Sequence, residues 1–229
     1  MKTPGLFVTG TDTGVGKTRA ATALCRAFAL CGHRVAAMKP VASGCRMTGA
    51  GLRNDDALAL CAAMNTRADY AQVNPYAFEP AIAPHIAAAE AGCTIDFDVL
   101  DRAYASLTMR SDLIIVEGAG GWLAPLDARR AFADLAAHWQ LDVILVVGMR
   151  LGCLNHALLT QESIERRGLR LRGWIANAID PQFERLEENI STLRSRIAAP
   201  CLSSWQFAPQ ADLDAAAHSL RAALFSGGR

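Results

Sequence analysis

A run of glycines, threonines and one lysine lies close to the N-terminus, between an apolar segment and an amphipathic one. It reads GTDTGVGKT and occupies residues 10–18. Glycines let the backbone curl so that successive N–H groups point inward, where they can bind an anion. Lys17 would then reach the β- and γ-phosphates of a nucleotide, and the Thr18 hydroxyl would take one position on Mg²⁺. The loop is stretched, because five residues rather than four separate Gly10 from Gly16.

A glycine-rich turn before a helix can also be purely structural. The Lys-Thr pair argues against that alternative, and so does the context, because the loop follows a predicted strand at 5–9 and opens a predicted helix at 18–31. The positive end of that helix adds to an anion site. The pattern therefore predicts a bound nucleotide polyphosphate. The residues expected around it are Thr13, Gly14, Val15, Gly16, Lys17 and Thr18.

Two acidic positions are candidates for the carboxylate that a Mg²⁺–nucleotide site requires. Glu117 ends the apolar run DLIIVE, although a strand end can also face solvent. Asp56 lies in RNDDALAL, where the alternative is simple capping of a helix by Asn54 or Asp55. Spacing alone leaves the role of Asp56 open.

A second lysine is expected near the same site. Lys39, in AAMKPVASG, follows a predicted strand and could neutralise charge on the γ-phosphate or on an anionic acceptor. The alternative is a solvated lysine at a strand exit. Ser43 follows in the loop, without the G-x-S-x-G context of a hydrolase nucleophile. After Glu117, backbone amides for phosphate or substrate are offered by Gly118, Ala119 and Gly120.

Two asparagines carry weaker signals. Asn155 opens a predicted helix after GMRLGCL, so it is either an N-cap or part of a helix start that holds a carboxylate. Asn177 ends the strand GWIAN, where its amide could read a purine edge.

The whole chain has 229 residues, 52% of them apolar and 20% charged, with a formal net charge of +1. That length suits one α/β domain over 1–229. Near-neutral charge gives no electrostatic reason to expect nucleic acid or an acidic membrane surface as a partner. The seven cysteines include no CxxC pair, and no apolar run suits a signal peptide or a membrane span. We therefore expect a soluble cytoplasmic protein with reduced thiols.

Apolar runs alternate with helical patterns along the chain, which predicts a doubly wound, mostly parallel sheet flanked by helices. The expected strands are 5–9, 34–40, 112–118, 142–148, 170–179 and a short one at 199–202. The expected helices are 18–31, 132–139, 154–167, 182–197 and one at the C-terminal end. Residues 44–110 read mostly as helices and long loops. In such sheets the active site lies at the carboxyl ends of the strands.

Several longer motifs together resemble the dethiobiotin synthetase family of P-loop NTPase-like proteins. They are GTDTxVGKT, KPVASG, GLRNxDALAL, VNPYxF with a following PH, VEGAGGW and ILVVGxxLGCxNHALLT. They occur in order from about residue 6 to 180, and the last fifty residues match poorly. The resemblance implies an enzyme of biotin synthesis that converts 7,8-diaminononanoate, CO₂ and ATP to dethiobiotin, ADP and phosphate. In that family a carbamate attacks the γ-phosphate, and the neighbouring amine captures the mixed anhydride.

The resemblance also implies roles for individual residues. It puts Lys17 and Lys39 on the transferring phosphate, and Thr18, Asp56 and Glu117 around Mg²⁺. The residues facing the diamine would be Thr11, Ser43 and Gly120. Those near adenine would be Asn177, Trp205 and Gln206. The family is a homodimer, with the substrate carboxylate held close to the partner subunit by Leu151, Gly152 and Asn155.

The chain departs from the family at two points. Some members have Glu where this chain has Gly14, so any role of that acid is absent. Some have a tyrosine that reaches the substrate carboxylate across the dimer, at a position that aligns with Asn189. An asparagine could donate one hydrogen bond, so we expect the pocket to survive with altered affinity. An unchanged diamine KM in Asn189→Ala would show that Asn189 has no such role.

Two other functions compete with this interpretation. Regulatory ATPases of the partitioning or septum-site type share the stretched loop but carry an extra lysine just after its first glycine, where this chain has Thr11 and Asp12. A different ATP-dependent ligase or amidating enzyme is the second alternative. Cofactor-ring amidases would need a glutaminase module with a nucleophilic Cys and a His, and that arrangement is not visible.

Overall fold

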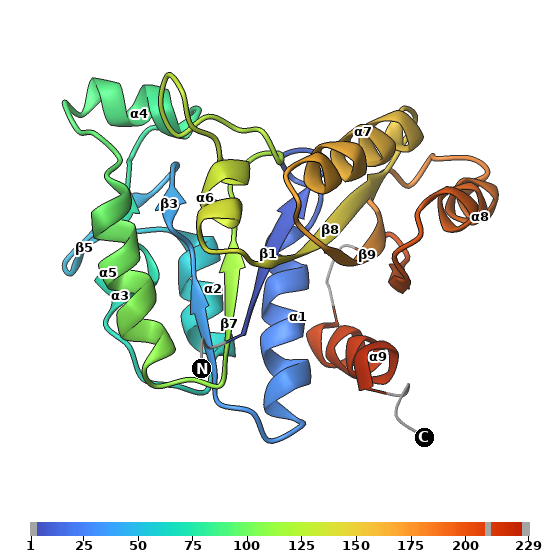
Figure 1. The fold of residues 1–229 in the computed structure, drawn as a ribbon, viewed down its shortest axis with the longest axis horizontal. Helices are drawn as coiled ribbons and strands as arrows, with labels where there is room; N and C mark the ends of the chain where they lie inside the picture. The colour runs from blue at the N-terminus through green and yellow to red at the C-terminus, as the bar shows by residue number, and fades with distance from the viewer. Residues whose placement is uncertain (1–3, 209–211, 226–229) are drawn as a thin grey trace.

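The computed structural model describes residues 4–208 and 212–225, and its central feature there is a six-stranded sheet (Figure 1). The strand order is β10-β9-β8-β1-β7-β2, and every neighbouring pair is parallel. The strands are β1 (Gly5–Gly10), β2 (Val35–Met38), β7 (Leu113–Glu117), β8 (Asp142–Met149), β9 (Leu171–Ala178) and β10 (Cys201–Trp205). The predicted doubly wound parallel sheet is confirmed.

Both faces of this sheet are buried, which explains the continuous apolar runs of its strands. Successive side chains of a strand point to opposite faces. In β1, Phe7 joins the cluster on one face, whereas Leu6 and Val8 join the cluster on the other.

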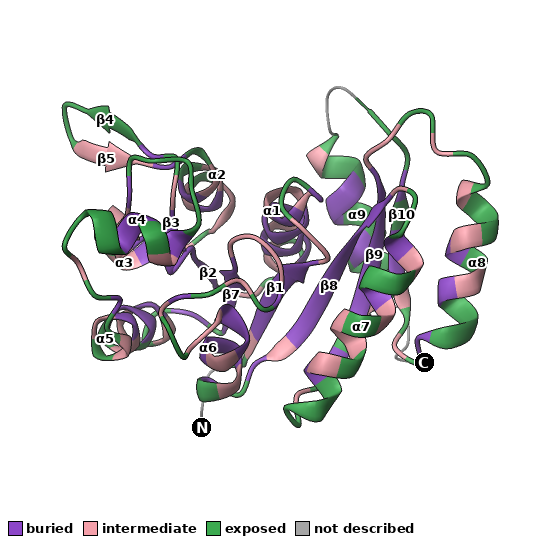
Figure 2. Cartoon of the chain, turned by 90° about the horizontal axis from the view of Figure 1, so that it is seen from above, coloured by how far each residue is buried: buried purple, intermediate pink, exposed green. Residues whose placement is uncertain are grey.

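Helices cover both faces, with their buried sides toward the strands (Figure 2). One face is covered by α1 (Lys17–Ala29) and α9 (Leu213–Phe225), with α2 (Asp55–Ala63) packed beside α1. The other face is covered by α5 (Phe97–Thr108), α6 (Phe132–His138), α7 (Cys153–Arg166) and α8 (Leu186–Arg196). The largest difference from the predicted bounds is at α8, which begins at Leu186 after a turn in which Arg185 has φ 59°.

The segment predicted as helices and loops, 44–110, contains those helices and also short strands that the sequence did not reveal. The additional helices are α3 (Tyr70–Val73) and α4 (Pro84–Glu90). The short strands of this region and its border are β3 (Val41–Ala42), β4 (Arg46–Thr48), β5 (Gly51–Arg53) and β6 (Tyr76–Ala77). With two or three residues each, they are too short to show an alternating pattern.

No helix in the described parts of the chain is both long and apolar enough to cross a membrane. The seven cysteines, all within 4–208, are free thiols.

The packing of α1 against the sheet makes a first prediction. Leu24 of α1 is fully buried, so Leu24→Ala is expected to lower the free energy of unfolding by about 2–5 kcal/mol, through lost burial and the remaining cavity. The matched control is Leu30→Ala, because Leu30, at the end of the same helix, is 50% exposed. Urea unfolding of both variants checks this, and similar midpoints for the two would contradict the packing described here.

Candidate active site

The predicted phosphate loop connects β1 to α1 at the carboxyl end of the sheet (Figure 1). Gly16 is the N-cap of α1, has φ 97° and leaves the helix without a side-chain cap. A Cβ on Gly10 would lie 2.5 Å from the Val15 side chain, so the loop folds closely on itself only with glycine there. The free N–H groups and the positive end of α1 therefore form an anion site.

A cleft of about 780 Å³ opens beside this loop. Predicted residues that line it are Thr13, Gly14, Gly16, Lys17, Thr18, Lys39, Ser43, Asp56, Glu117, Ala119 and Gly120. One wall of the cleft comes from the segment just before α4 and from the first residue of α4. Its residues are Ala81, Ile82, Ala83 and Pro84. The structure thus brings together residues from the loop between β1 and α1, the start of α1, the segment after β2, α2 and the end of β7, which are far apart in the sequence.

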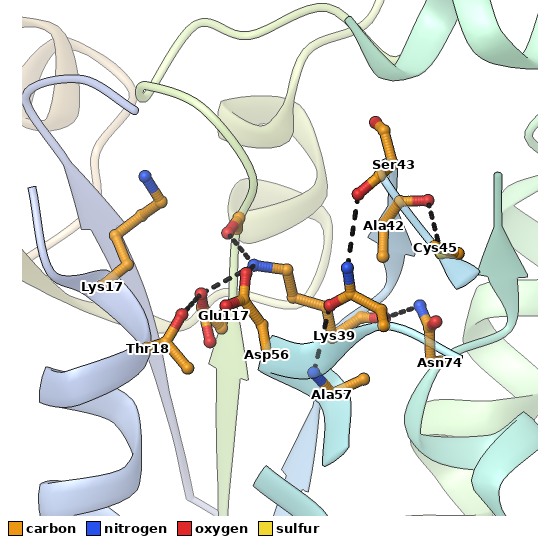
Figure 3. A network of polar contacts seen from close by, with 12 residues as sticks. Lys17, Thr18, Lys39, Ala42, Ser43, Cys45, Asp56, Ala57, Asn74 and Glu117 are labelled. Carbon is orange, nitrogen blue, oxygen red and sulfur yellow. Dashed lines mark hydrogen bonds and ion pairs between the residues drawn. The ribbon is translucent and has the colours of Figure 1, made fainter. Parts of the chain in front are cut away.

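At the centre of the site, the ammonium of Lys39 lies between two carboxylates (Figure 3). Its Nζ is 2.6 Å from Glu117 Oε1, 2.9 Å from Asp56 Oδ2 and 3.2 Å from the Gly118 carbonyl oxygen. The Lys39 and Glu117 side chains are only 3% and 0% exposed. The solvated alternatives for both residues are therefore wrong.

This pairing keeps Lys39 charged. Burial alone would lower the pKa of its ammonium, but the charges of Glu117 and Asp56 outweigh burial and raise that pKa. The cation can therefore act on a negatively charged reactant. Asn74, which the sequence analysis missed, holds its backbone, since Asn74 Nδ2 donates to the Lys39 carbonyl oxygen at 2.8 Å.

The structure shows which residue caps α2 and where the Asp56 carboxylate points. Asn54 is the N-cap of α2, and its side chain accepts a hydrogen bond from the Ala57 N–H. Asp56 is therefore not the capping residue, and its carboxylate turns toward Lys39 in the cleft (Figure 3).

Three oxygen-bearing side chains near Lys39 suit a bound Mg²⁺. Thr18 Oγ1 donates to Glu117 Oε1 at 2.8 Å, and Asp56 Oδ2 lies 2.9 Å from Lys39 Nζ. Glu117 Oε2 is buried and has no hydrogen-bond partner among the described residues, an arrangement that is costly unless a cation or water completes it. Mg²⁺ is usually held by one or two carboxylates together with waters and phosphate oxygens. The residues present therefore fit the metal.

Lys17 is folded back on the phosphate loop. Its Nζ donates to the Asp12 carbonyl oxygen at 2.8 Å. Burial, together with the charge of Lys39, lowers the pKa of Lys17 to about 8. Arg150, another residue missed in the sequence, forms an ion pair with the Asp12 carboxylate and so ties the end of β8 to the loop.

The lowered pKa of Lys17 predicts proton uptake when a nucleotide binds. At pH 8 about half of the Lys17 side chains are neutral, and nearby phosphate charge raises the pKa again, so binding of ADP takes up about half a proton. At pH 6 Lys17 is already charged and contributes no uptake. Calorimetry in buffers of different ionisation enthalpy measures this number, and net proton release at pH 8 would contradict the prediction.

Residues expected near adenine lie beside the loop but do not line the cleft. The Asn177 side chain is buried, and its Nδ2 donates to the Val15 carbonyl oxygen at 2.9 Å. Trp205 ends β10 in register with Asn177 on β9, and Gln206 is exposed. Contact of these residues with a base stays a prediction.

Residues expected near the substrate carboxylate lie at the start of α7. Leu151 is 91% exposed, and Asn155 is exposed on the helix. The N-cap is Gly152, with φ 93°, so the alternative in which Asn155 caps this helix is wrong. No side chain caps α7, and its first turn has no acidic residue. The Cys153 N–H donates to the Arg150 carbonyl oxygen at 3.0 Å, whereas the N–H groups of Leu154 and Asn155 have no backbone partner among the described residues.

Thr11 lies between the two regions. Its Oγ1 accepts a hydrogen bond from the Gly148 N–H at 3.2 Å. It also lines a smaller hollow of about 340 Å³ together with Leu123, His156 and Leu159.

Comparison with known proteins gives sequence relatives over nearly the full chain. A family profile described as an AAA domain matches residues 4–212. An ATP-dependent dethiobiotin synthetase of Xanthomonas euvesicatoria pv. vesicatoria is 52% identical over 96% of this chain and 99% of that protein. Another, from Pseudomonas paraeruginosa, is 54% identical over 87% of this chain and 88% of that protein.

Solved structures share the architecture at much lower identity. The MinC:MinD cell division protein complex of Aquifex aeolicus matches with a TM-score of 0.62 at 15% identity, over 99% of this chain and 97% of that one. The cell division ATPase MinD of Pyrococcus furiosus matches with a TM-score of 0.55 at 15% identity, over 97% and 98%. At such identity the likeness shows a P-loop NTPase fold, while the sequence relatives argue against the septum-site alternative.

Proposed function

The chain belongs to the ATP-dependent dethiobiotin synthetases, ligases of biotin biosynthesis, and from this premise we propose how its site closes the ureido ring of dethiobiotin. The reactants would be 7,8-diaminononanoate, CO₂ and ATP, and the products dethiobiotin, ADP and phosphate. The observation that carries the proposal is the buried Lys39–Glu117 pair beside the phosphate loop, at the edge of a cleft of about 780 Å³ that the diamine and the phosphates of ATP would share.

The phosphates of ATP would lie on the loop at the start of α1. Lys17 would leave the Asp12 carbonyl oxygen and donate to the β- and γ-phosphates. Backbone amides would come from Thr13 to Thr18 and from Gly118, Ala119 and Gly120. These groups neutralise charge and fix the direction of attack, which is most of what phosphoryl transfer requires of a protein.

Mg²⁺ would be held by Thr18, Asp56 and Glu117, and when bound it would neutralise charge on the phosphates. The unpartnered Glu117 Oε2 supports this assignment.

The chemistry needs no covalent intermediate on the enzyme. One amine of the diamine adds to CO₂ and loses a proton, which forms a carbamate. A carbamate oxygen attacks the γ-phosphorus, and ADP leaves. The second amine then attacks the carbamoyl carbon of the mixed anhydride, and as the ring closes phosphate leaves and the attacking nitrogen loses one proton to phosphate or solvent. Lys39, charged and buried, would offset the growing negative charge in these steps, while Thr11, Ser43 and Gly120 would face the diamine.

The carboxylate end of the diamine would bind at the uncapped start of α7, with Leu151, Gly152 and Asn155 around it. We infer that a second copy of the chain packs near this end. Leu123 and Leu159, both lining the smaller hollow, are 53% and 56% exposed, and Leu151 is 91% exposed. Apolar side chains gathered in this way favour a protein interface.

The dimer makes a prediction of its own. Sedimentation equilibrium should give twice the chain mass for the wild type, and Leu159→Glu should shift the protein toward monomer because it places a charge in the apolar interface. Leu30→Glu, an exposed leucine on the opposite face of the sheet, is the control. A wild-type monomer with full activity would refute the dimer.

We further propose that the chain works in the cytoplasm as one domain, without nucleic acid or membrane partners. The free cysteines and the near-neutral net charge support this.

Labelled bicarbonate tests the reaction. With ¹³C-bicarbonate, diaminononanoate, ATP and Mg²⁺, mass spectrometry should find dethiobiotin that carries the label in its ureido carbon. Product formation should stop when any of these reactants is omitted. Unlabelled product, or none, would contradict the proposed reaction.

A further inference from the structure

We propose that Arg19, whose guanidinium lies over the Trp205 ring, is the side chain on which the nucleobase stacks, and that Asn177 serves to brace the phosphate loop. This inference rests on the proposed nucleotide site. It assigns base binding to a residue that none of the sequence motifs singled out.

The placement of Arg19 follows from the helix start. It is the third residue of α1, directly after Thr18. Its guanidinium carbon lies 4.4 Å from the centroid of the Trp205 ring, which is cation–π distance. Trp205 ends β10 at the carboxyl edge of the sheet, in register with Asn177. Arg19 and Trp205 are therefore within reach of a base whose phosphates lie on the loop.

Asn177 is already committed to contacts within the protein. Its Nδ2 donates to the Val15 carbonyl oxygen, and its Oδ1 accepts from an Arg19 NH group at 3.3 Å. The side chain is 6% exposed, and a Cβ on Gly16 would lie 2.4 Å from its amide nitrogen. Asn177 therefore supports the loop from behind.

Two hydrogen-bond donors of Arg19 and Trp205 remain without an acceptor. Arg19 Nε and Trp205 Nε1 are buried without a hydrogen-bond partner among the described residues. Arg19 itself is only half-buried, so part of its side chain remains accessible to a ligand. A guanidinium that lies on an indole on one side can stack a base on the other, and its donors can meet acceptors at the edge of a purine.

Stacking of this kind tolerates different bases, because every base has a π face. The structure thus indicates that Arg19 contributes to the binding of ADP and GDP alike. A ligand that has phosphates but no base gains nothing from it.

The test compares ligands with and without a base. Dissociation constants of ADP, GDP and tripolyphosphate are measured by calorimetry for the wild type and for Arg19→Ala. We expect the variant to bind both nucleotides about tenfold more weakly, and tripolyphosphate within about twofold of the wild type. Unchanged tripolyphosphate binding also shows that the loop of the variant is folded.

Two further variants separate charge from stacking. Arg19→Lys keeps the charge but loses the planar group, so it should lose most of the nucleotide affinity as well. Arg26→Ala removes a cation from the same helix, where it pairs with Asp214 away from the cleft, and should leave all three constants unchanged.

Three results would overturn the inference. They are unchanged nucleotide affinity in Arg19→Ala, wild-type affinity in Arg19→Lys, and an equal loss for tripolyphosphate, which would place Arg19 on a phosphate. If the wild type bound none of the three ligands, the proposed nucleotide site itself would fail together with this inference.

Discussion

Replacing Lys39 by alanine should lower kcat for dethiobiotin formation by about 10³-fold, the size of effect seen when a group that stabilises transferring phosphoryl charge is removed. Lys39 is charged and buried, and its Nζ contacts both Glu117 and Asp56 at the cleft. Water is a poor replacement for this cation, because Lys39 is only 3% exposed and contacts two carboxylates. The measurement is steady-state product formation at saturating ATP and Mg²⁺.

Lys39→Ala should also have a lower free energy of unfolding, and this loss of stability has to be separated from the loss of kcat. Removal of one partner of a buried ion pair costs about 3–5 kcal/mol, because the fully buried Glu117 carboxylate is left uncompensated. ADP affinity, measured at the assay temperature, reports whether the loop of the variant is folded, because ADP lacks the γ-phosphate on which Lys39 is proposed to act. Activity within tenfold of the wild type in a folded variant would remove Lys39 from the mechanism.

The second large effect on kcat is expected for Glu117→Gln. The amide keeps the shape of the side chain, but it replaces a buried anion that accepts from Thr18 and Lys39. We expect a loss of at least about 10² in kcat and a marked increase in the Mg²⁺ concentration needed for half-maximal activity, because an amide is a poorer ligand for a hard cation.

A Mg²⁺ titration of activity separates this role from a general loss of structure. Glu90→Gln, on an exposed position at the end of α4, is the matched control and should behave like the wild type. An unchanged Mg²⁺ requirement in a folded Glu117→Gln would exclude this residue as a metal ligand.

The sequence predicts well those site residues that lie at or directly after the end of a strand. The phosphate loop, Lys39 and Glu117 each follow an apolar run, and the parallel sheet brings the ends of β1, β2 and β7 to the same edge. Local pattern therefore implies proximity, since the carboxyl ends of such strands share one edge.

Other parts depend on packing between elements that the sequence does not relate. Asp56 reaches Lys39 only because α2 packs beside α1, and its own neighbours are equally consistent with a helix cap. Arg19 and Trp205 come from α1 and β10, which are remote in the sequence. The sequence predicts a helix over 154–167 with Asn155 as a possible cap, because an asparagine is a common cap, whereas the structure has Gly152, with a positive φ, as the N-cap.

Phosphate release is the most direct test of the central claim, that this site couples ATP cleavage to ring closure. It is measured with ATP and Mg²⁺, in the presence and absence of diaminononanoate and bicarbonate. We predict that the wild type releases phosphate only when both are present, with one dethiobiotin formed for each phosphate, and that Lys39→Ala does so very slowly. Equal release without the diamine would contradict the account and would indicate a regulatory ATPase or a different acceptor on the same phosphate loop.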